Sequence, residues 1–392
     1  ADVAPVGGGF GGILWGSAGI TVAWESYLQY NDVRMLAEHY GAMKSYIDYL
    51  VGYIDPVTGI MTEGNLGDWL GPEQDENDNT LLWEAYFIYD LGLMHRMASV
   101  LNKKDDAVWF GKLYSERKEF FNKTYFNPKT GQTIHSGFLH PDKKGELVGT
   151  QTSYVLPLAF GICNEEIKDL AIRQLMVCIE NKIAQNGEVV YPPYSLMTGF
   201  IGTAWINRVL SDHGYSEAAY RILQQKTYPS WLYSVEQGAT TIWERLNSYT
   251  SEHGFSGNNS MNSFNHYSFG AIGSWMYNHS LGIERDENFP GFKHFILQPE
   301  PDPTGQMTSA KGYYESMYGR IESGWQIIEN VCYYHFRVPA NTTATLYLQS
   351  TSADKINVGN KPLVSSKGVE IIGEENGKVI MKLQPGEYQF RY

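Results

Sequence analysis

The chain has 392 residues, enough for two domains, and its formal net charge of −13 makes it strongly acidic. That charge argues against nucleic acid or an anionic membrane surface as a partner, and no apolar run is long enough to span a bilayer. Aromatic residues make up 14% of the chain and recur in polar stretches as well as apolar ones. Exposed aromatic rings in an acidic protein favour sugar binding over phosphate binding.

The first 285 residues alternate amphipathic segments with loops rich in glycine and proline. Helical spacing of apolar residues is clearest in Ile20–Tyr30, Val33–Tyr53, Leu81–Leu101 and Ala107–Tyr125. It continues less regularly in Thr152–Phe160, Ile167–Ile183, Phe200–His213, Glu217–Gln224 and Tyr267–Leu281. Short connections between successive helices imply antiparallel pairs, so residues 1–285 are predicted to form an all-α domain of helical hairpins.

The loops between these helices fall into two classes. Asn31-Asp32 and Gly214-Tyr215 are short, whereas Gly59–Thr80 and Glu236–Asn265 are long and rich in Gly, Trp, Asp and Asn. This alternation is expected when hairpins close into an (α/α)6 toroid with the functional loops on one face. Such a toroid needs about twelve helices, and the sequence predicts roughly nine or ten. We therefore expect the toroid to be incomplete at its N-terminus, with a hairpin lying upstream.

The pattern changes after Ile283. Residues 285–303 are rich in proline and are interpreted as a linker. Short alternating runs follow at Gly319–Ser323, Gly324–Glu329, Val331–Val338, Ala344–Gln349, Val369–Ile372, Lys378–Lys382 and Tyr388–Tyr392. These runs, separated by Asn, Gly and Pro, predict an antiparallel β-sandwich over residues 286–392. It contains no catalytic constellation, so we expect it to brace the helical domain.

The cysteines and acidic clusters give no sign of a metal or a cofactor. Cys163, Cys178 and Cys332 lie far apart and are odd in number, so neither a zinc site nor a disulfide framework is indicated. We interpret them as small buried hydrophobic residues. The acidic run that begins at Glu73 lacks the glycine and final glutamate of a calcium loop.

The stretch Thr240–Phe269 carries the strongest functional signal. Glu244 lies between an aromatic and a basic residue, and a loop of Ser, Gly and Asn follows. The loop ends in a second polar and aromatic cluster, Asn262, Asn265, His266 and Tyr267. Aromatic rings pack on the C–H face of a sugar ring, amides and imidazole bind hydroxyls, and a carboxylate moves a proton. The alternative is a solvated loop whose aromatic residues belong to the core.

Several blocks of the sequence resemble the α-L-rhamnosidases of glycoside hydrolase family 78. The matching blocks are WGSAGITVAWESYLQYNDVRMLAEHYGAMKSYIDYL from Trp15, GDWLGP from Gly67, TGFIGTAWINRVLSDHGYSEAAYRIL from Thr198, YPSW followed by GATTIWER, MNSFNHYSFGAIGSWMY from Met261, and KGYYESMYGRIESGW in the β-region. They follow the family's order over most of the chain. The resemblance implies an (α/α)6 toroid followed by a β-sandwich, and inverting hydrolysis of terminal α-L-rhamnosides.

The resemblance also implies roles for individual residues. Glu244, in TIWER, matches the family's general base, the carboxylate that activates water. Trp15 in WGSAG, Trp69 in GDW and His266 in NHY match residues that line its sugar pocket. Asp68, in the same GDW block, is expected either to bind a sugar hydroxyl or to cap a helix.

Three neighbours of these matched residues are expected to shape the loop. They are Trp243, Arg245 and Asn262, and we count Trp243 among the substrate-binding candidates as well. The implied partner is a rhamnose-containing oligosaccharide or glycoside, with no metal and no cofactor.

One departure from the family concerns the general acid. Family members carry a block of the type DERLGWTGD before the WGSAG block, and this sequence contains none. We therefore expect the acid to lie upstream of this chain. The run EQDEND, from Glu73 to Asp78, offers a substitute if burial raises the pKa of one carboxyl. Consecutive acids are more typical of a solvated face or of a helix N-terminus, where their negative charge interacts favourably with the helix dipole.

Two further functional hypotheses stay open. One is a different toroid glycosidase, either glucoamylase-like or an unsaturated glucuronyl hydrolase. The other is a non-catalytic carbohydrate-binding protein. Glycan hydrolysis favours an exported location, periplasmic or extracellular, over the cytoplasm. The sequence fixes neither the natural glycan nor the oligomeric state.

Overall fold

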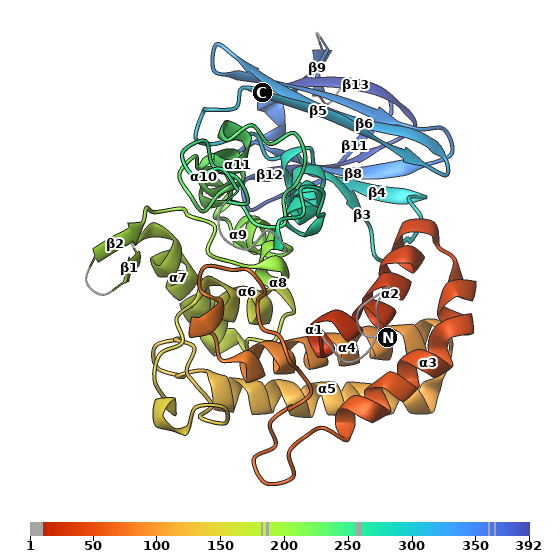
Figure 1. Cartoon of the computed structure of the whole chain (residues 1–392). Helices are drawn as coiled ribbons and strands as arrows, with labels where there is room; N and C mark the ends of the chain where they lie inside the picture. The colour runs from red at the N-terminus through yellow and green to blue at the C-terminus, as the bar shows by residue number, and fades with distance from the viewer. Residues whose placement is uncertain (1–10, 182, 186–187, 256–260, 360, 364–365) are drawn as a thin grey trace. The chain divides into compact units, whose positions relative to one another are not determined.

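The computed structural model describes residues 11–392 except 182, 186–187, 256–260, 360 and 364–365 (Figure 1). It divides into two compact units, and helix α2 (Ala18–Tyr30) contributes to both. The first unit comprises Ala1–Trp24 and Val33–Ala271, and the second comprises Glu25–Asp32 and Ile272–Tyr392. The domain boundary expected between residues 285 and 286 falls inside the second unit and stays a prediction.

Helices dominate the first unit, as expected from its apolar periodicity. Besides the first part of α2, its helices are α1 (Ile13–Gly16), α3 (Val33–Val51), α4 (Asn79–Val100), α5 (Lys104–Tyr125), α6 (Gln151–Ala159), α7 (Glu165–Glu180), α8 (Phe200–Thr203), α9 (Ile206–Asp212), α10 (Ser216–Gln224) and α11 (Trp231–Glu236). A small antiparallel pair, β1 (Ile183–Gln185) and β2 (Glu188–Tyr191), follows α7. Helices α4 with α5, α6 with α7, and α9 with α10 pack as successive hairpins, which confirms the prediction of paired helices.

Helix α4 forms the centre of this unit, because its residues are buried on all sides rather than along one stripe. Its buried acid Glu84 pairs with Arg117 of α5, with nitrogen–oxygen distances of 2.5 and 2.8 Å. Asp78 caps the start of α4 by accepting a hydrogen bond from the Thr80 N–H at 3.0 Å. The helix is thus anchored at its first turn and along its side.

The structure corrects several helix predictions. The helix expected over Phe200–His213 is broken between α8 and α9, where the Trp205 N–H bonds to the carbonyl three residues back and its ring packs against Phe160. Helix α11 was not predicted, although Ser230 caps it by accepting from the Tyr233 N–H at 3.1 Å. The helix expected over Tyr267–Leu281 is a succession of a 3₁₀ turn (Ser268–Ala271), α12 (Ile272–Trp275) and a π turn (Met276–Ser280).

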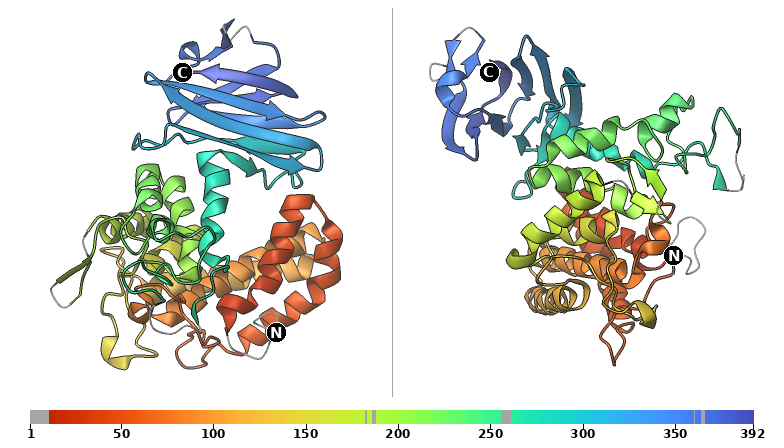
Figure 2. Two further views of the ribbon diagram at one scale, coloured as in Figure 1. Left: turned by 45° about the horizontal axis from the view of Figure 1, so that its top comes forward. Right: turned by 90° about the vertical axis from the view of Figure 1, so that its left-hand side faces the viewer.

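The second unit contains two sheets (Figure 2), and they enclose one apolar core. Its strands are β3 (Ile283–Arg285), β4 (His294–Leu297), β5 (Ser309–Ser316), β6 (Gly319–Ile328), β7 (Val331–Val338), β8 (Thr343–Gln349), β9 (Asn357–Val358), β10 (Lys361–Pro362), β11 (Val369–Glu375), β12 (Lys378–Leu383) and β13 (Gly386–Arg391). One sheet has the order β10-β9-β13-β7-β6-β5 and the other β11-β12-β8-β4-β3. Core residues such as Trp325 and Phe336 from the first sheet and Leu346 from the second confirm the predicted sandwich.

Three strand predictions in this unit were wrong in detail. The residues interpreted as a linker include β4, whose Phe295 and Leu297 lie in the core, and the start of the linker coincides with the end of β3. The two runs expected to be separate at Ser323 and Gly324 form the single strand β6. The sandwich is also not wholly antiparallel, because β4 and β8 pair in parallel.

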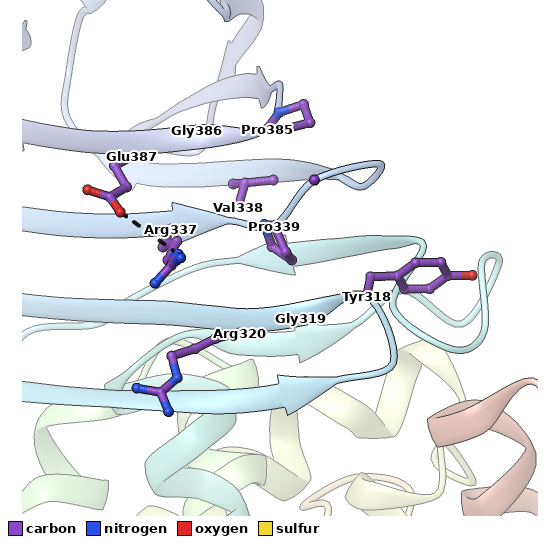
Figure 3. Close-up of a pocket in the computed structure, with 10 residues that line it drawn as sticks. Tyr318, Gly319, Arg320, Arg337, Val338, Pro339, Pro385, Gly386 and Glu387 are labelled. Carbon is purple, nitrogen blue, oxygen red and sulfur yellow. Dashed lines mark ion pairs between the residues drawn. The ribbon is translucent and has the colours of Figure 1, made fainter.

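A shallow hollow lies at one end of the six-stranded sheet (Figure 3). Tyr318 and Pro339 border it, and Arg337 lies 3.8 Å from Glu387 across neighbouring strands. The charged side chains here are well exposed to solvent, so their ion pairs contribute little to stability.

Candidate active site

Asp68 lies in the loop that precedes α4 and is almost completely buried, with 1% of its surface exposed. Its carboxylate accepts four hydrogen bonds, from the Thr152 hydroxyl and from the backbone N–H groups of Gly199 (2.7 Å), Ile201 (2.8 Å) and Gly202 (3.1 Å). Burial raises the pKa of this carboxyl, and the four donors act in the opposite direction. Asp68 therefore binds backbone N–H groups at the start of α8, the kind of contact expected of a helix cap, and sugar binding by Asp68 stays a prediction.

The next residue, Trp69, is half-buried and is joined to the same segment by its backbone. The Phe200 N–H donates a hydrogen bond of 3.0 Å to the Trp69 carbonyl. The Phe200 ring in turn stacks on His266, with centroids 4.8 Å apart and an angle of 28° between the planes. The GDW, TGF and NHY blocks, which are far apart in the sequence, thus meet in one cluster.

His266 is held on three sides. Its backbone N–H donates to the Ile242 carbonyl at 2.9 Å, and its ring stacks on Phe200. The Ser268 N–H approaches ring atom Nδ1 at 3.4 Å, so Nδ1 is the acceptor and Nε2 carries the proton. In this tautomer the ring offers Nε2–H as a donor to an oxygen such as a sugar hydroxyl.

Glu244 is held by a reciprocal pair of contacts with Ser263, on the far side of its loop. The Glu244 N–H donates to the Ser263 carbonyl at 2.8 Å, and the Ser263 N–H donates to Glu244 Oε2 at 2.9 Å. The side chain is half-buried. Carboxylate oxygen Oε2 is thus oriented by the backbone, and the carboxylate has further lone pairs with which to accept a proton.

The neighbours of Glu244 build the loop. Trp243 is buried, with 7% of its surface exposed, and its ring packs edge-on against Phe264 at 5.2 Å. Arg245 donates a hydrogen bond from Nη2 to Asn262 Oδ1. These contacts agree with the expectation that the three residues shape the loop, and direct sugar binding by Trp243 stays a prediction. Part of this loop, residues 256–260, lies outside the described residues.

Trp15 lies on the short helix α1 and is half-buried. Just before it, Gly12 forms an isolated antiparallel bridge with Gly64, at the start of the long loop that carries Trp69. A Cβ atom at Gly12 would lie 2.6 Å from the Gly64 Cα, so the two backbones meet where only glycine fits. The WGSAG block is therefore tied to the GDW loop, and contact of Trp15 with a sugar stays a prediction.

The acidic run from Glu73 to Asp78 is divided by its surroundings. Asp75 and Glu76 are exposed, whereas Asp78 caps α4. Glu73 accepts a hydrogen bond of 3.0 Å from the Gln151 N–H in the first turn of α6, and burial raises its pKa to about 7. Two of the acids thus lie at helix N-termini, the more typical of the two roles considered for this run.

Comparison with known families identifies the family to which the chain belongs. Residues 1–280 match the bacterial alpha-L-rhamnosidase 6 hairpin glycosidase domain, and residues 282–362 match the bacterial alpha-L-rhamnosidase C-terminal domain. The chain belongs to the bacterial α-L-rhamnosidases. This membership confirms the predicted class of a six-hairpin helical domain followed by a β-domain.

Individual relatives support the same family assignment. An alpha-L-rhamnosidase of Formosa agariphila is 33% identical over 383 residues, which are 96% of this chain and 38% of that protein. One of Streptomyces avermitilis is 31% identical over 391 residues, which are 99% of this chain and 34% of that protein. The chain thus spans little more than a third of the length of these relatives.

Solved structures of rhamnosidases have the same fold. The crystal structure of Streptomyces avermitilis alpha-L-rhamnosidase complexed with L-rhamnose has a TM-score of 0.82 at 30% identity, covering all of this chain and 34% of that one. The structure of the enzyme from Dictyoglumus thermophilum has a TM-score of 0.81 at 30% identity, with 97% and 40% coverage.

Sequence reasoning missed the residues that connect the site. Phe200 was assigned only to a helix, and Thr152 only to the start of another. Their signal was indirect, because the first lies in the TGF block and the second lies 84 residues from the carboxylate that it binds. Neither periodicity nor a local motif shows that a threonine hydroxyl and a distant aspartate meet.

Among the described residues, no helix is both long enough and apolar enough to cross a bilayer.

Proposed function

We propose that this chain forms the base-bearing part of an inverting α-L-rhamnosidase, which removes terminal α-L-rhamnose from glycans or glycosides. The observation that carries the proposal is the orientation of Glu244. Its carboxylate is fixed by the Ser263 N–H within the loop that also carries His266. The family membership supports the substrate class, and the co-crystallised L-rhamnose of the Streptomyces avermitilis enzyme agrees with it.

In this mechanism Glu244 takes a proton from water while the water oxygen attacks the anomeric carbon. The glycosidic C–O bond breaks on the opposite face, and the departing oxygen receives a proton from a second carboxylic acid. The products are a free sugar of inverted anomeric configuration and the alcohol of the aglycone. The family resemblance assigns the second acid to the DERLGWTGD-type block, which is absent from this sequence.

The remaining site residues bind the sugar rather than react with it. The rings of Trp15 and Trp69 offer apolar faces to a 6-deoxy sugar, whose methyl group makes it less polar than most hexoses. His266 donates Nε2–H to a ring hydroxyl. Such contacts hold the anomeric carbon within reach of the water that Glu244 activates.

The test is Glu244→Gln in the intact protein, with an aryl α-L-rhamnoside as substrate. We expect kcat to fall by at least about a thousandfold, because an amide cannot accept the proton, while the affinity for L-rhamnose changes little. Glu76→Gln, which alters an exposed acid of the acidic run, serves as the control and retains activity. Turnover of the Glu244 variant near the parent rate would remove Glu244 from the mechanism.

Substrate choice and stereochemistry separate the rhamnosidase from another toroid glycosidase. The intact, unsubstituted protein is assayed with aryl α-L-rhamnoside, aryl α-D-glucoside and an unsaturated glucuronide. We expect turnover of the rhamnoside alone, and proton NMR at early times detects β-L-rhamnose as the first product. Preferential cleavage of either other substrate contradicts the assignment, as does α-L-rhamnose as the first product.

A further inference from the structure

Two segments of the first unit are joined by a clamp, which we define as residues 68–71, residues 199–202 and Thr152. Oδ2 of Asp68 accepts from the Thr152 hydroxyl and the Gly199 N–H, and Oδ1 accepts from the N–H groups of Ile201 and Gly202. An ionised carboxylate has about four lone-pair positions. All of them are occupied here by protein donors, and the side chain is 1% exposed. Asp68 therefore has no capacity left to bind a sugar hydroxyl.

The two backbones of the clamp touch so closely that side chains are excluded between them. A Cβ atom at Gly71 would lie 2.5 Å from the Gly199 nitrogen, and one at Gly199 would overlap the carbonyl oxygens of Asp68 and Trp69. The Phe200 N–H donates to the Trp69 carbonyl at 3.0 Å in the same contact. Trp69 and Phe200 are thus fixed relative to each other although they come from distant parts of the chain.

The clamp also holds one residue in an unfavourable conformation. Leu70 has a φ of +62°, in the left-handed region that a bulky residue rarely adopts. Its N–H donates to Gln74 Oε1 at 2.9 Å, and the Gly71 N–H donates to the Asp68 carbonyl at 3.2 Å. Residues in such conformations persist where the surrounding structure holds them in place, and in proteins generally they cluster at ligand-binding and active sites.

The clamp is connected to the candidate catalytic loop through aromatic contacts. Phe200 stacks on His266 at 4.8 Å, and the His266 N–H bonds to the carbonyl of Ile242, two residues before Glu244. A displacement of Phe200 would therefore reach both the imidazole and the segment that carries the carboxylate.

We propose that Asp68 is a positioning residue, which fixes Trp69 directly and His266 through Phe200 and makes no contact with the sugar. This role rests on the proposed function, because Trp69 and His266 matter only if the site binds a sugar. It differs from simple capping of α8, since that helix has four residues and the carboxylate bonds also fix the loop on which Asp68 itself lies.

The first test is Asp68→Asn in the intact protein, with isothermal titration of L-rhamnose as the measurement. The amide must turn an N–H group toward backbone N–H donors on one side, so at least one clamp contact is lost. We expect the dissociation constant for L-rhamnose to rise about tenfold, as small misplacements of binding groups have large effects. Unchanged affinity in the folded variant overturns the proposal.

A second pair of variants keeps the proposal testable if the asparagine variant fails to fold. Thr152→Val removes the hydroxyl donor but retains the shape of the side chain, whereas Thr152→Ser retains the hydroxyl. We expect the valine variant to bind L-rhamnose several-fold more weakly than the serine variant. Equal affinity of the two overturns the proposal.

A matched control separates positioning from general loss of stability. Glu84→Gln alters another fully buried carboxylate, which pairs with Arg117 between α4 and α5. We expect this variant to have a lower Tm and the parent affinity for L-rhamnose. If Glu84→Gln weakens the binding of L-rhamnose as much as Asp68→Asn does, and the two variants have the same Tm, the effect is general and the positioning role is wrong. If the parent protein itself does not bind L-rhamnose, the proposed function fails first and this inference fails with it.

Discussion

The clamp around Asp68 and the loop that carries Glu244 (Glu236–Asn265, the Glu244 loop) use their carboxylates in opposite ways. In the clamp, every lone pair of the Asp68 carboxylate is taken by a protein donor, and two glycines bring the backbones into contact. In the Glu244 loop, the backbone orients Oε2 through Ser263 and the side chain is only half-buried. A saturated carboxylate holds structure, whereas one with remaining capacity and access to solvent is available for chemistry.

The largest effect on stability is expected from Gly199→Ala. A Cβ atom there overlaps two carbonyl oxygens that belong to backbone and cannot rotate away. We expect the free energy of unfolding to fall by about 3 kcal/mol, at the upper end for overpacking of a tight site. Urea denaturation measures this, with Gly19→Ala as the control, because a Cβ atom there would meet no atom within 4 Å apart from its chain neighbours and the backbone of its own helix. Equal stability of the two variants would contradict the tight contact.

The second prediction concerns Glu73, which ties the GDW loop to the start of α6. Its pKa is raised from 4.5 to about 7, so the folded state binds a proton more tightly than the unfolded state. The stability that protonation of Glu73 contributes to the folded state is therefore fully present below about pH 4.5 and is lost as the pH rises through about 7.

Thermal unfolding between pH 4 and pH 8 measures this loss. We expect the parent Tm to fall by several degrees over this range and the Glu73→Gln variant to show a flatter dependence. Glu76→Gln, at an exposed position three residues on, should follow the parent. If the Tm of the Glu73→Gln variant depends on pH as steeply as that of the parent, groups other than Glu73 cause the dependence.

A smaller effect is expected where the two regions meet. Phe200→Leu keeps an apolar side chain but removes the ring that stacks on His266. An aromatic pair contributes about 1 kcal/mol beyond buried area, so we expect roughly a fivefold weaker affinity for L-rhamnose. Titration calorimetry of the folded variant checks this, and parental affinity would mean that the stack does not orient the imidazole.

The smallest effect on stability is expected from Glu244→Gln, the variant with the largest expected effect on turnover. Its carboxylate is half-buried, and the amide oxygen can still accept from the Ser263 N–H. We expect the free energy of unfolding to stay within about 0.5 kcal/mol of the parent. A loss as large as that of Gly199→Ala would place Glu244 among the structural acids.

The sequence predicted the helices whose apolar pattern is long and continuous. Helices α3, α4 and α5 begin and end within a few residues of the expected positions. The predictions were wrong where a tertiary contact overrides periodicity, as at Trp205, whose ring packs against Phe160 and interrupts the helix. Strand β4 was missed because prolines and glycines surround it, and its pairing with β3 and β8 on either side makes those four residues a strand.

For the candidate site, motif order predicted which segments would meet but not how. Glu244, His266 and Trp69 lie on segments that the structure connects through Phe200. The role of Asp68 could not be settled from the sequence, since a sugar hydroxyl and a backbone N–H are both good partners for a carboxylate. In the structure the partners of this carboxylate are protein donors, and they come from residues more than 80 positions away.

The parallel pairing of β4 with β8 has a consequence for how the β-unit is assembled during synthesis. The hairpin of β3 and β4 leaves the ribosome early, but β4 completes its pairing only with residues 343–346 of β8, about 50 residues later. At 5–20 residues per second this interval lasts a few seconds, during which Phe295 and Leu297 lie on an unpaired strand edge. Slowing translation between β4 and β8 would therefore lengthen the time for which this apolar strand edge is open to aggregation.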